Sequence, residues 1–280
     1  MPKIDEHRGP DEALLQKARE LPTRRPDRRA LDNIKNDTYT AQVSTAKPPS
    51  KPSAGAPYLL HISALDYERI TRKIQDEATV QITDQVAFIS FLWAALNRAR
   101  ARTQSRPSLD LHLALSFRWL LGLPDGLLGS PLIAVMMNGS KEGKASYTDA
   151  IKLAAEITET PDKFDEDALL AITYDASLRN SPTSILRSAE WKERMEFTSG
   201  VGFRSSNFSF GSHSPVFVRP IFLPADNLFI MAEGLPNNPS TVSSKWYKYG
   251  ADVFFSVPQD VLQALLADPA FATLELLSEA

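Results

Sequence analysis

The chain contains no cysteine among its 280 residues. Disulfide scaffolds, cysteine-based zinc sites and thiol nucleophiles are therefore excluded. No apolar run approaches the roughly 18–20 residues that cross a bilayer, and the polar start of the sequence lacks the apolar core of a signal peptide. We therefore expect a cytoplasmic protein that does not enter a membrane.

The signatures of several other classes are missing as well. The glycines within residues 122–129 lack the Lys-Ser/Thr pair or the third glycine of nucleotide-binding loops, and no Gly-x-Ser-x-Gly nucleophile elbow occurs. The four histidines are scattered along the chain, so we expect no metal site. The net charge of −3 argues against nucleic acid as a partner.

What the sequence does contain is a pattern of short strands and helices. Apolar residues make up 43% and charged residues 23% of the chain, which is near the average for globular domains. Apolar periodicity predicts the elements of an α/β fold. We expect strands at 58–62, 109–117, 132–137, 196–199, 216–219, 220–223, 228–232 and 251–257, and helices at 11–20, 64–77, 83–102, 147–158, 164–177 and from 258 onward.

Two of these helices carry particular expectations. The helix at 83–102 is apolar over a wide arc and should be central, and Thr83 is a suitable N-cap for it. In the helix at 64–77, we expect Leu65, Ile70 and Ile74 to mark the buried face.

The most unusual stretch lies at residues 195–220, where two short strand patterns flank a loop. In this loop Phe208 and Phe210 are followed by Gly211 and Pro215. Aromatic side chains need a surface to pack on, and glycine permits backbone turns that other residues resist. We interpret the loop as support for a site rather than as solvent-exposed filler.

Residues 207–211, Asn-Phe-Ser-Phe-Gly, followed by Pro215, resemble the Asp-Phe-Gly-Trp-Gly-(Lys)-Pro segment of the BAHD acyltransferases. The fungal branch, which includes trichothecene 3-O-acetyltransferases, is most similar because it tolerates Phe where plants use Trp. Three positions depart from the pattern: Asn207 replaces Asp, Ser209 replaces Gly, and Ser214 stands where Lys is frequent.

Other segments share the resemblance. Thr83, Trp93 and the Arg98–Arg100 pair are spaced as in the family's Ser-Thr-x-Asp-x-Leu-x-Ala-x-(Leu/Ile)-Trp helix, and Arg118 is placed like the arginine that precedes the family's Pro-x-Gly-x-x-Gly-Asn run. The resemblance covers about residues 57–277, which correspond to the C-terminal half of a typical family member.

The resemblance implies a CoA-dependent acyltransferase-like fold of the chloramphenicol acetyltransferase type, with a mixed β-sheet and packed helices. It also suggests a division of the chain. Residues 1–34 would be a remnant of the N-terminal half, residues 35–57 a Pro-rich crossover linker, and residues 58–280 the C-terminal acyltransferase-like domain.

A His-x-x-x-Asp string runs from His7 to Asp11, where the family's catalytic motif should lie. The resemblance implies that His7 is the base that takes a proton from a hydroxyl or amine as it attacks a thioester. It also implies that Asp11 holds this loop by pairing with Arg118. The residues of the aromatic loop would support the site without taking part in chemistry: Asn207, Phe208, Phe210 and Gly211.

The histidines have other interpretations. An exposed terminal histidine is the alternative for His7. His61 and His112 lie inside strand patterns, so we interpret them as buried or half-buried residues with satisfied hydrogen bonds. We interpret His213, in the aromatic loop, as a packing or capping residue.

The function implied by the resemblance is transfer of an acyl group, most simply acetyl, to a hydroxyl or amine of a small secondary metabolite. The co-substrate would be acyl-CoA, for instance acetyl-CoA, and no cofactor would be bound permanently. Basic residues near the linker would be available to meet the CoA phosphates.

A second hypothesis belongs to a different class. The chain would be a catalytically inactive or truncated BAHD-like chain that acts as a binding or interaction module. The missing first half, Asn207 in place of Asp, and Glu12 where the family has Gly favour this hypothesis. Such a chain would expose an apolar face, and would self-associate or pair with a partner that supplies the missing half.

Overall fold

The computed structural model describes most of the chain between residues 11 and 279. The described ranges are 11–22, 57–103, 109–118, 120–124, 132–137, 146–178, 194–202, 208–209, 211–213, 215, 218, 226–234, 246–271 and 275–279. Contacts between residues divide the chain into a smaller and a larger compact unit. Of the strands expected at 216–219 and 220–223, only Val218 lies within the described residues.

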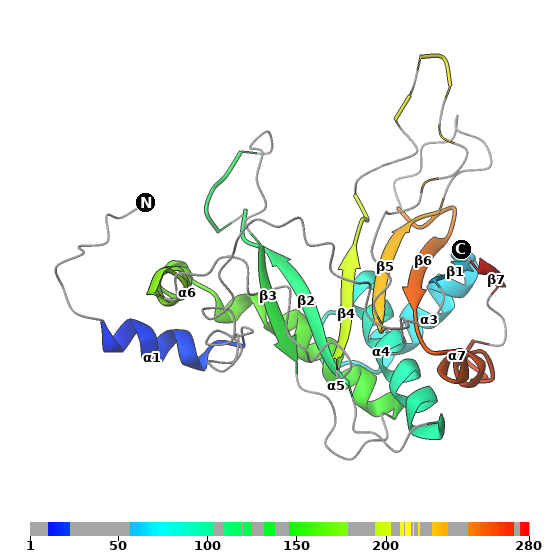
Figure 1. The fold of residues 1–280 in the computed structure, drawn as a ribbon, viewed down its shortest axis with the longest axis horizontal. Helices are drawn as coiled ribbons and strands as arrows, with labels where there is room; N and C mark the ends of the chain where they lie inside the picture. The colour runs from blue at the N-terminus through cyan, green and yellow to red at the C-terminus, as the bar shows by residue number, and fades with distance from the viewer. Residues whose placement is uncertain are drawn as a thin grey trace, which may run out of the picture. The chain divides into compact units, whose positions relative to one another are not determined.

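A mixed β-sheet runs through the fold (Figure 1). Its strands are β1 (Pro57–Ile62), β2 (Asp110–Ser116), β3 (Leu132–Met137), β4 (Arg194–Ser199), β5 (Leu228–Glu233), β6 (Ala251–Ser256) and β7 (Glu275–Glu279). Their order is β3-β2-β4-β5-β6-β1-β7. Strand β4 runs parallel to both β2 and β5. Strand β6 is antiparallel to β5 and to β1, and β1 is antiparallel to β7. The predicted α/β fold with a mixed sheet is therefore confirmed.

Helix α4 (Asp84–Thr103) is the central helix of the larger unit, and it contacts both α3 (Ala64–Glu77) and α7 (Gln259–Leu266). Because α4 is apolar on nearly all sides, it must be buried on nearly all sides, and most of it is. Thr83 Oγ1 accepts a hydrogen bond from Val86 N at 3.3 Å, so the predicted N-cap is confirmed.

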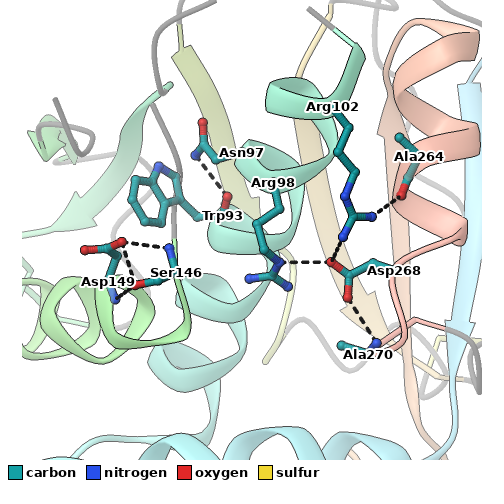
Figure 2. Close-up of polar contacts among 9 residues, drawn as sticks. All are labelled: Trp93, Asn97, Arg98, Arg102, Ser146, Asp149, Ala264, Asp268 and Ala270. Atoms are coloured by element: carbon teal, nitrogen blue, oxygen red, sulfur yellow. Dashed lines mark hydrogen bonds and ion pairs between the residues drawn. The ribbon is translucent and has the colours of Figure 1, made fainter. Parts of the chain in front are cut away.

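Two polar side chains of α4 fix the start of β2. Trp93 Nε1 donates to Leu109 O at 2.7 Å, and Leu109 N donates to Asn97 Oδ1 at the same distance. Asn97 Nδ2 also donates to Trp93 O at 3.0 Å (Figure 2). Both backbone polar groups of the buried Leu109 are thus satisfied by α4, which holds β2 in place beside the helix.

The two faces of the sheet can be told apart at β1. Tyr58 Oη donates to Gln259 Oε1 of α7 at 2.6 Å, so Tyr58 lies on the face that carries α7. Side chains alternate along a strand, which places Leu59 and His61 on the opposite face. We call this opposite side the second face of the sheet. Asp252 and Phe254 of β6 also lie on it, because they stand opposite His61 and Leu59 of β1.

The smaller unit contains α1 (Glu12–Glu20), a 3₁₀ turn (Pro161–Lys163) and α6 (Glu166–Leu178), and α1 contacts α6. Asp11 is the N-cap of α1, and its backbone N–H donates to Tyr174 Oη of α6 at 2.8 Å. Lys17 Nζ lies 3.2 Å from Asp165 Oδ1. The Ala168 N–H and then Lys17 hold the pKa of the Asp165 carboxyl below its ordinary value. The remaining helix, α5 (Tyr147–Glu159), lies almost wholly in the larger unit.

One predicted buried position in α3 is wrong. The Leu65 side chain is 77% exposed, whereas Ile70 and Ile74 are buried as expected. Tyr67 takes the missing place in the buried stripe, because positions 67, 70, 71 and 74 share one side of a helix of 3.6 residues per turn. Leu65 lies about 200° around the helix axis from Tyr67, and therefore points away from the core.

Candidate functional site

The segment that begins at Gly200 leaves the sheet at the carboxyl ends of the parallel strands β4 and β5. Gly200 N continues the strand pairing by donating to Met231 O at 2.7 Å. Gly202 N donates to Glu233 Oε1 at 2.9 Å, which fastens the start of the loop to the end of β5. Ligands of open α/β sheets bind beyond the carboxyl ends of strands, so this edge is the candidate functional site.

The described part of the loop shows its backbone turn and one of its aromatic residues. Gly211 has a φ of 66°, a conformation that favours glycine, as the sequence suggested. The side chain of Phe208 is 56% exposed rather than packed. Asn207 and Phe210 lie outside the described residues, so the supporting role of the loop stays a prediction.

The three residues of the predicted catalytic constellation are placed as follows. His7 lies outside the described residues. Asp11 Oδ1 accepts hydrogen bonds from Ala13 N at 3.1 Å and Leu14 N at 3.2 Å, which is the geometry of a helix cap. Arg118 Nη1 donates to Pro124 O at 3.1 Å. Since these contacts are local to each residue, the Asp11–Arg118 pair stays a prediction.

A histidine–aspartate pair lies at the same edge of the sheet as the loop. His61, near the end of β1, stands directly opposite Asp252, near the start of β6. His61 Nδ1 is 2.6 Å from Asp252 Oδ1, and the two side chains are 30% and 11% exposed. His61 is therefore half-buried with a satisfied nitrogen, as interpreted from the sequence, but its acidic partner was not foreseen.

A second histidine–acid pair lies in the interior of the same sheet. His112 of β2 stands opposite Glu196 of β4, and His112 Nδ1 is 3.6 Å from Glu196 Oε1. Arg194 Nε approaches the same carboxylate oxygen more closely, at 2.7 Å. Because His112 is only 6% exposed, the interpretation of a buried structural histidine is confirmed.

The pairing of His61 with Asp252 has no signal in the sequence. Each residue sits in a recognisable strand pattern, but 191 positions separate them. Only the antiparallel register of β1 with β6 brings them together, and register is a property of the folded sheet.

In the ranges that the structure describes, no three His, Asp or Glu side chains gather closely enough to hold a metal ion. No helix of those ranges is long and apolar enough to cross a membrane.

Comparisons with known proteins give three informative likenesses. "Acyltransferase abl6" of Leptosphaeria maculans is 62% identical over 278 residues, which cover 99% of this chain and 55% of that protein. "Acyltransferase AFT15-1" of Alternaria alternata is 28% identical over 95% of this chain and 53% of that protein. The crystal structure of TRI101 of F. sporotrichioides, complexed with coenzyme A and T-2, has a TM-score of 0.62 and 16% identity, covering 82% of this chain and 52% of that one. No protein-family model matches the chain.

The sheet, its helices and the likeness to TRI101 define the fold as that of the CoA-dependent acyltransferases. The close sequence relationship to a curated acyltransferase takes this one step further: the chain is similar to an acyltransferase over nearly its whole length, which agrees with the BAHD resemblance of its sequence motifs. The chain spans about half the length of the curated relatives that it matches.

Proposed function

We propose that the chain supports the transfer of an acyl group, most simply acetyl, from acyl-CoA to a hydroxyl or amine of a small secondary metabolite in the cytoplasm. The observation that carries this proposal is the 62% identity to an acyltransferase over nearly the whole chain. The likeness of the fold to TRI101, which binds coenzyme A in its crystal, supports a CoA thioester as the donor.

The roles of the residues follow from the family motif. His7 would take the proton from the attacking hydroxyl or amine, which makes the oxygen or nitrogen a better nucleophile toward the thioester carbon. Asp11 and Arg118 would hold the segment that bears His7. The loop that leaves β4 would support the site at its far side through Asn207, Phe208, Phe210 and Gly211.

The test combines binding with turnover. Acetyl-CoA is titrated into the purified chain by calorimetry, and the release of free CoA is followed with a thiol reagent while small alcohols and amines are supplied. Because the chain has no cysteine, the thiol signal comes from CoA alone. His7→Ala is compared with Gln16→Ala, an exposed polar residue of α1 whose side chain donates to Glu20.

Three outcomes separate the hypotheses. Binding followed by CoA release that His7→Ala abolishes and Gln16→Ala retains supports the enzyme. Binding without release, in a chain that self-associates strongly in solution, supports the alternative of a binding or interaction module. If acetyl-CoA neither binds nor loses its acyl group, the proposed function is wrong for this chain.

A further inference from the structure

Tyr174 of α6 makes a hydrogen bond that joins two distant parts of the sequence. Asp11 N donates to Tyr174 Oη at 2.8 Å, although 163 positions separate the two residues. Tyr174 is only 9% exposed, whereas Asp11 lies at the surface. The exposed start of α1 is therefore tied to a side chain that is packed inside the smaller unit.

The sequence of α1 offers no partner of its own for this N–H. In a capping box, a Glu or Gln three residues after the N-cap accepts the hydrogen bond of the N-cap N–H. In α1 that position is Leu14, whose side chain has no acceptor. Tyr174 thus supplies from another helix what a capping box supplies locally. The place where α1 begins depends on α6 rather than on α1 alone.

The far end of α1 lies against the same helix. Lys17 Nζ is 3.2 Å from Asp165 Oδ1 and 3.7 Å from Asp167 Oδ2, at the beginning of α6. The start of α1 thus lies beside Tyr174, late in α6, and its last turn lies beside Asp165, so the two helices run antiparallel. The side chains of these ion pairs are 38–78% exposed, and exposed pairs contribute little. The shielded hydrogen bond to Tyr174 is therefore the firmer of the two attachments.

Asp11 is also the last residue of the His-x-x-x-Asp string in the sequence. Its N–H belongs to the planar peptide unit that links Asp11 to the residue before it. Four positions separate Asp11 from His7, a reach of at most about 14 Å. Over so short a reach, a shift at Asp11 is passed on to His7, and a misplacement of about 1 Å in a reacting group can cost about 100-fold in rate.

We propose that Tyr174 is a positioning residue for the base: by accepting the Asp11 N–H, it locates on α6 the segment that bears His7. This inference rests on the proposed function, in which His7 takes the proton of the acceptor. Tyr174 acts through Asp11 and takes no part in the chemistry. Because the tie runs through the backbone, it leaves the Asp11 carboxylate to cap α1 and does not need the predicted pair with Arg118.

The first test needs no acyl transfer. Tyr174→Phe keeps the packed ring and removes the acceptor of the Asp11 N–H. Amide hydrogen exchange of the intact chain, measured by mass spectrometry on peptides covering residues 11–20, should become about fivefold faster or more, because the hydrogen bond that holds the helix start is lost. Thr173→Ala is the matched control, since its hydroxyl donates to Leu169 O at 2.8 Å within α6 itself. It should leave the exchange of α1 unchanged.

The position of His7 can be followed directly. In a chain with ¹³C-labelled histidine rings, the His7 signal is identified by its loss in His7→Ala. We expect Tyr174→Phe to shift or narrow this signal, and Thr173→Ala to leave it in place. The His112 signal, from the buried histidine of β2 in the larger unit, should stay the same in both variants. Unchanged exchange of α1, or an unchanged His7 signal, in a folded Tyr174→Phe variant would overturn the proposal.

A double-mutant cycle separates positioning from a general effect on stability. With His7 present, Tyr174→Phe should lower the rate of CoA release by about tenfold or more. In the His7→Ala background, with free imidazole supplied as the proton acceptor, the same change should have no further effect, because no base remains on the segment. A purely structural role of Tyr174 would lower both rates by the same factor, which contradicts the inference.

The two proposals fail in different ways. CoA release that requires His7 but is normal in Tyr174→Phe would retain the proposed function and overturn this inference. A wild-type chain that never releases CoA would contradict the proposed function, while the exchange of α1 and the His7 signal still decide whether Tyr174 holds the segment.

Discussion

Arg98 Nε donates a hydrogen bond to Asp268 Oδ2 at 2.9 Å, and this contact ties the second half of α4 to the turn that follows α7 (Figure 2). Asp268 Oδ1 also accepts from Ala270 N at 3.1 Å, which shapes the turn itself. The carboxylate is nearly inaccessible, with 6% of the side chain exposed. A buried charge is tolerated only when such partners satisfy it, so the pair is a structural joint between the two helices.

The Asp268 joint predicts a dependence of stability on pH. Burial by itself would raise the pKa of Asp268, but the Arg98 and Ala270 hydrogen bonds and the charges of Arg98 and Arg102 outweigh it and hold the pKa below its ordinary value. A lowered folded-state pKa stabilises the protein above the unfolded value of about 3.9, and this stabilisation is lost as the pH falls through the folded value. Asp268→Asn should lower the free energy of unfolding at neutral pH by about 1–3 kcal/mol and reduce its decline in acid.

Denaturant unfolding between neutral and acid pH measures both effects. Arg102→Gln is the matched control, because Arg102 is 49% exposed and its Nη2 lies 3.9 Å from Asp268 Oδ2. It should cost no more than about 0.5–1 kcal/mol. Equal losses of unfolding free energy in Asp268→Asn and Arg102→Gln would show that the Arg98–Asp268 contact does not connect the two helices energetically.

Asn97 should be essential for placing β2. Replacing it by Ala leaves the buried Leu109 N–H without its acceptor and removes the bond to Trp93 O. An unsatisfied buried N–H costs about 1–3 kcal/mol, so Asn97→Ala should lower the free energy of unfolding by at least that much. Thr103→Ala, near the exposed end of the same helix, should lower the free energy of unfolding far less. Comparable losses in the two variants would contradict a special role of the Asn97 hydrogen bonds in placing β2.

Most elements of this fold were predictable because their signals are local, although strand β7 (Glu275–Glu279) was not among the expected strands. Apolar periodicity predicts the helices and strands, and Thr83, as a capping residue, marks the start of α4 in the sequence itself. Which side of a helix faces the core is harder to predict from sequence. Leu65 fitted an apolar pattern, yet the aromatic cluster around Tyr67 determines which side of α3 is buried.

The candidate site was only partly predictable. The loop after β4 was identified by its own residues, Phe208 and Gly211 among them. The His61–Asp252 pair was not, since it depends on a register between segments far apart in the sequence. Asp11 shows a different limit: an aspartate before a helix can cap it or bind an arginine, and the sequence pattern is the same for both uses.

Tyr67 offers a test of an unsatisfied hydroxyl. Its Oη is buried and has no hydrogen-bond partner among the described residues, while its ring lies 4.9 Å from that of Phe88 and 4.8 Å from that of Tyr247. Burial, then the charge of Asp84 and the neighbouring Tyr247, raise the pKa of this hydroxyl. Tyr67→Phe keeps the ring contacts and removes the desolvated group, so it should raise the free energy of unfolding by about 1 kcal/mol.

Tyr58→Phe provides the contrast. Tyr58 is equally buried, but its hydroxyl donates to Gln259 Oε1 at 2.6 Å. The same chemical change should therefore lower the free energy of unfolding by about 0.5–1.5 kcal/mol. Urea midpoints of the two variants measured side by side decide the matter, and a loss in Tyr67→Phe as large as that in Tyr58→Phe would count against an orphaned hydroxyl.

Gly211 should contribute to stability only through its backbone conformation. A Cβ at this position would meet no atom within 4 Å, so Gly211→Ala costs only the strain of a φ of 66°, about 1–2 kcal/mol. Gly211→Asn should cost less, because Asn tolerates this conformation better than Ala. Thermal unfolding of both variants ranks these costs, and a ranking in which Asn is the worse replacement would contradict the backbone explanation.

Asp11 can be assigned to its cap or to its predicted pair with Arg118 by one set of substitutions. A cap needs an oxygen that accepts from Ala13 N and Leu14 N, which Asn also provides, whereas an ion pair needs the charge. If the cap is its main role, Asp11→Ala should cost about 0.5–2 kcal/mol and Asp11→Asn almost nothing. If the pair with Arg118 holds the segment that bears His7, Asp11→Asn and Arg118→Ala should each lower both the melting temperature and the rate of CoA release. Activity and melting temperature unchanged in Arg118→Ala would rule out the pair and leave Asp11 as the first residue of a helix.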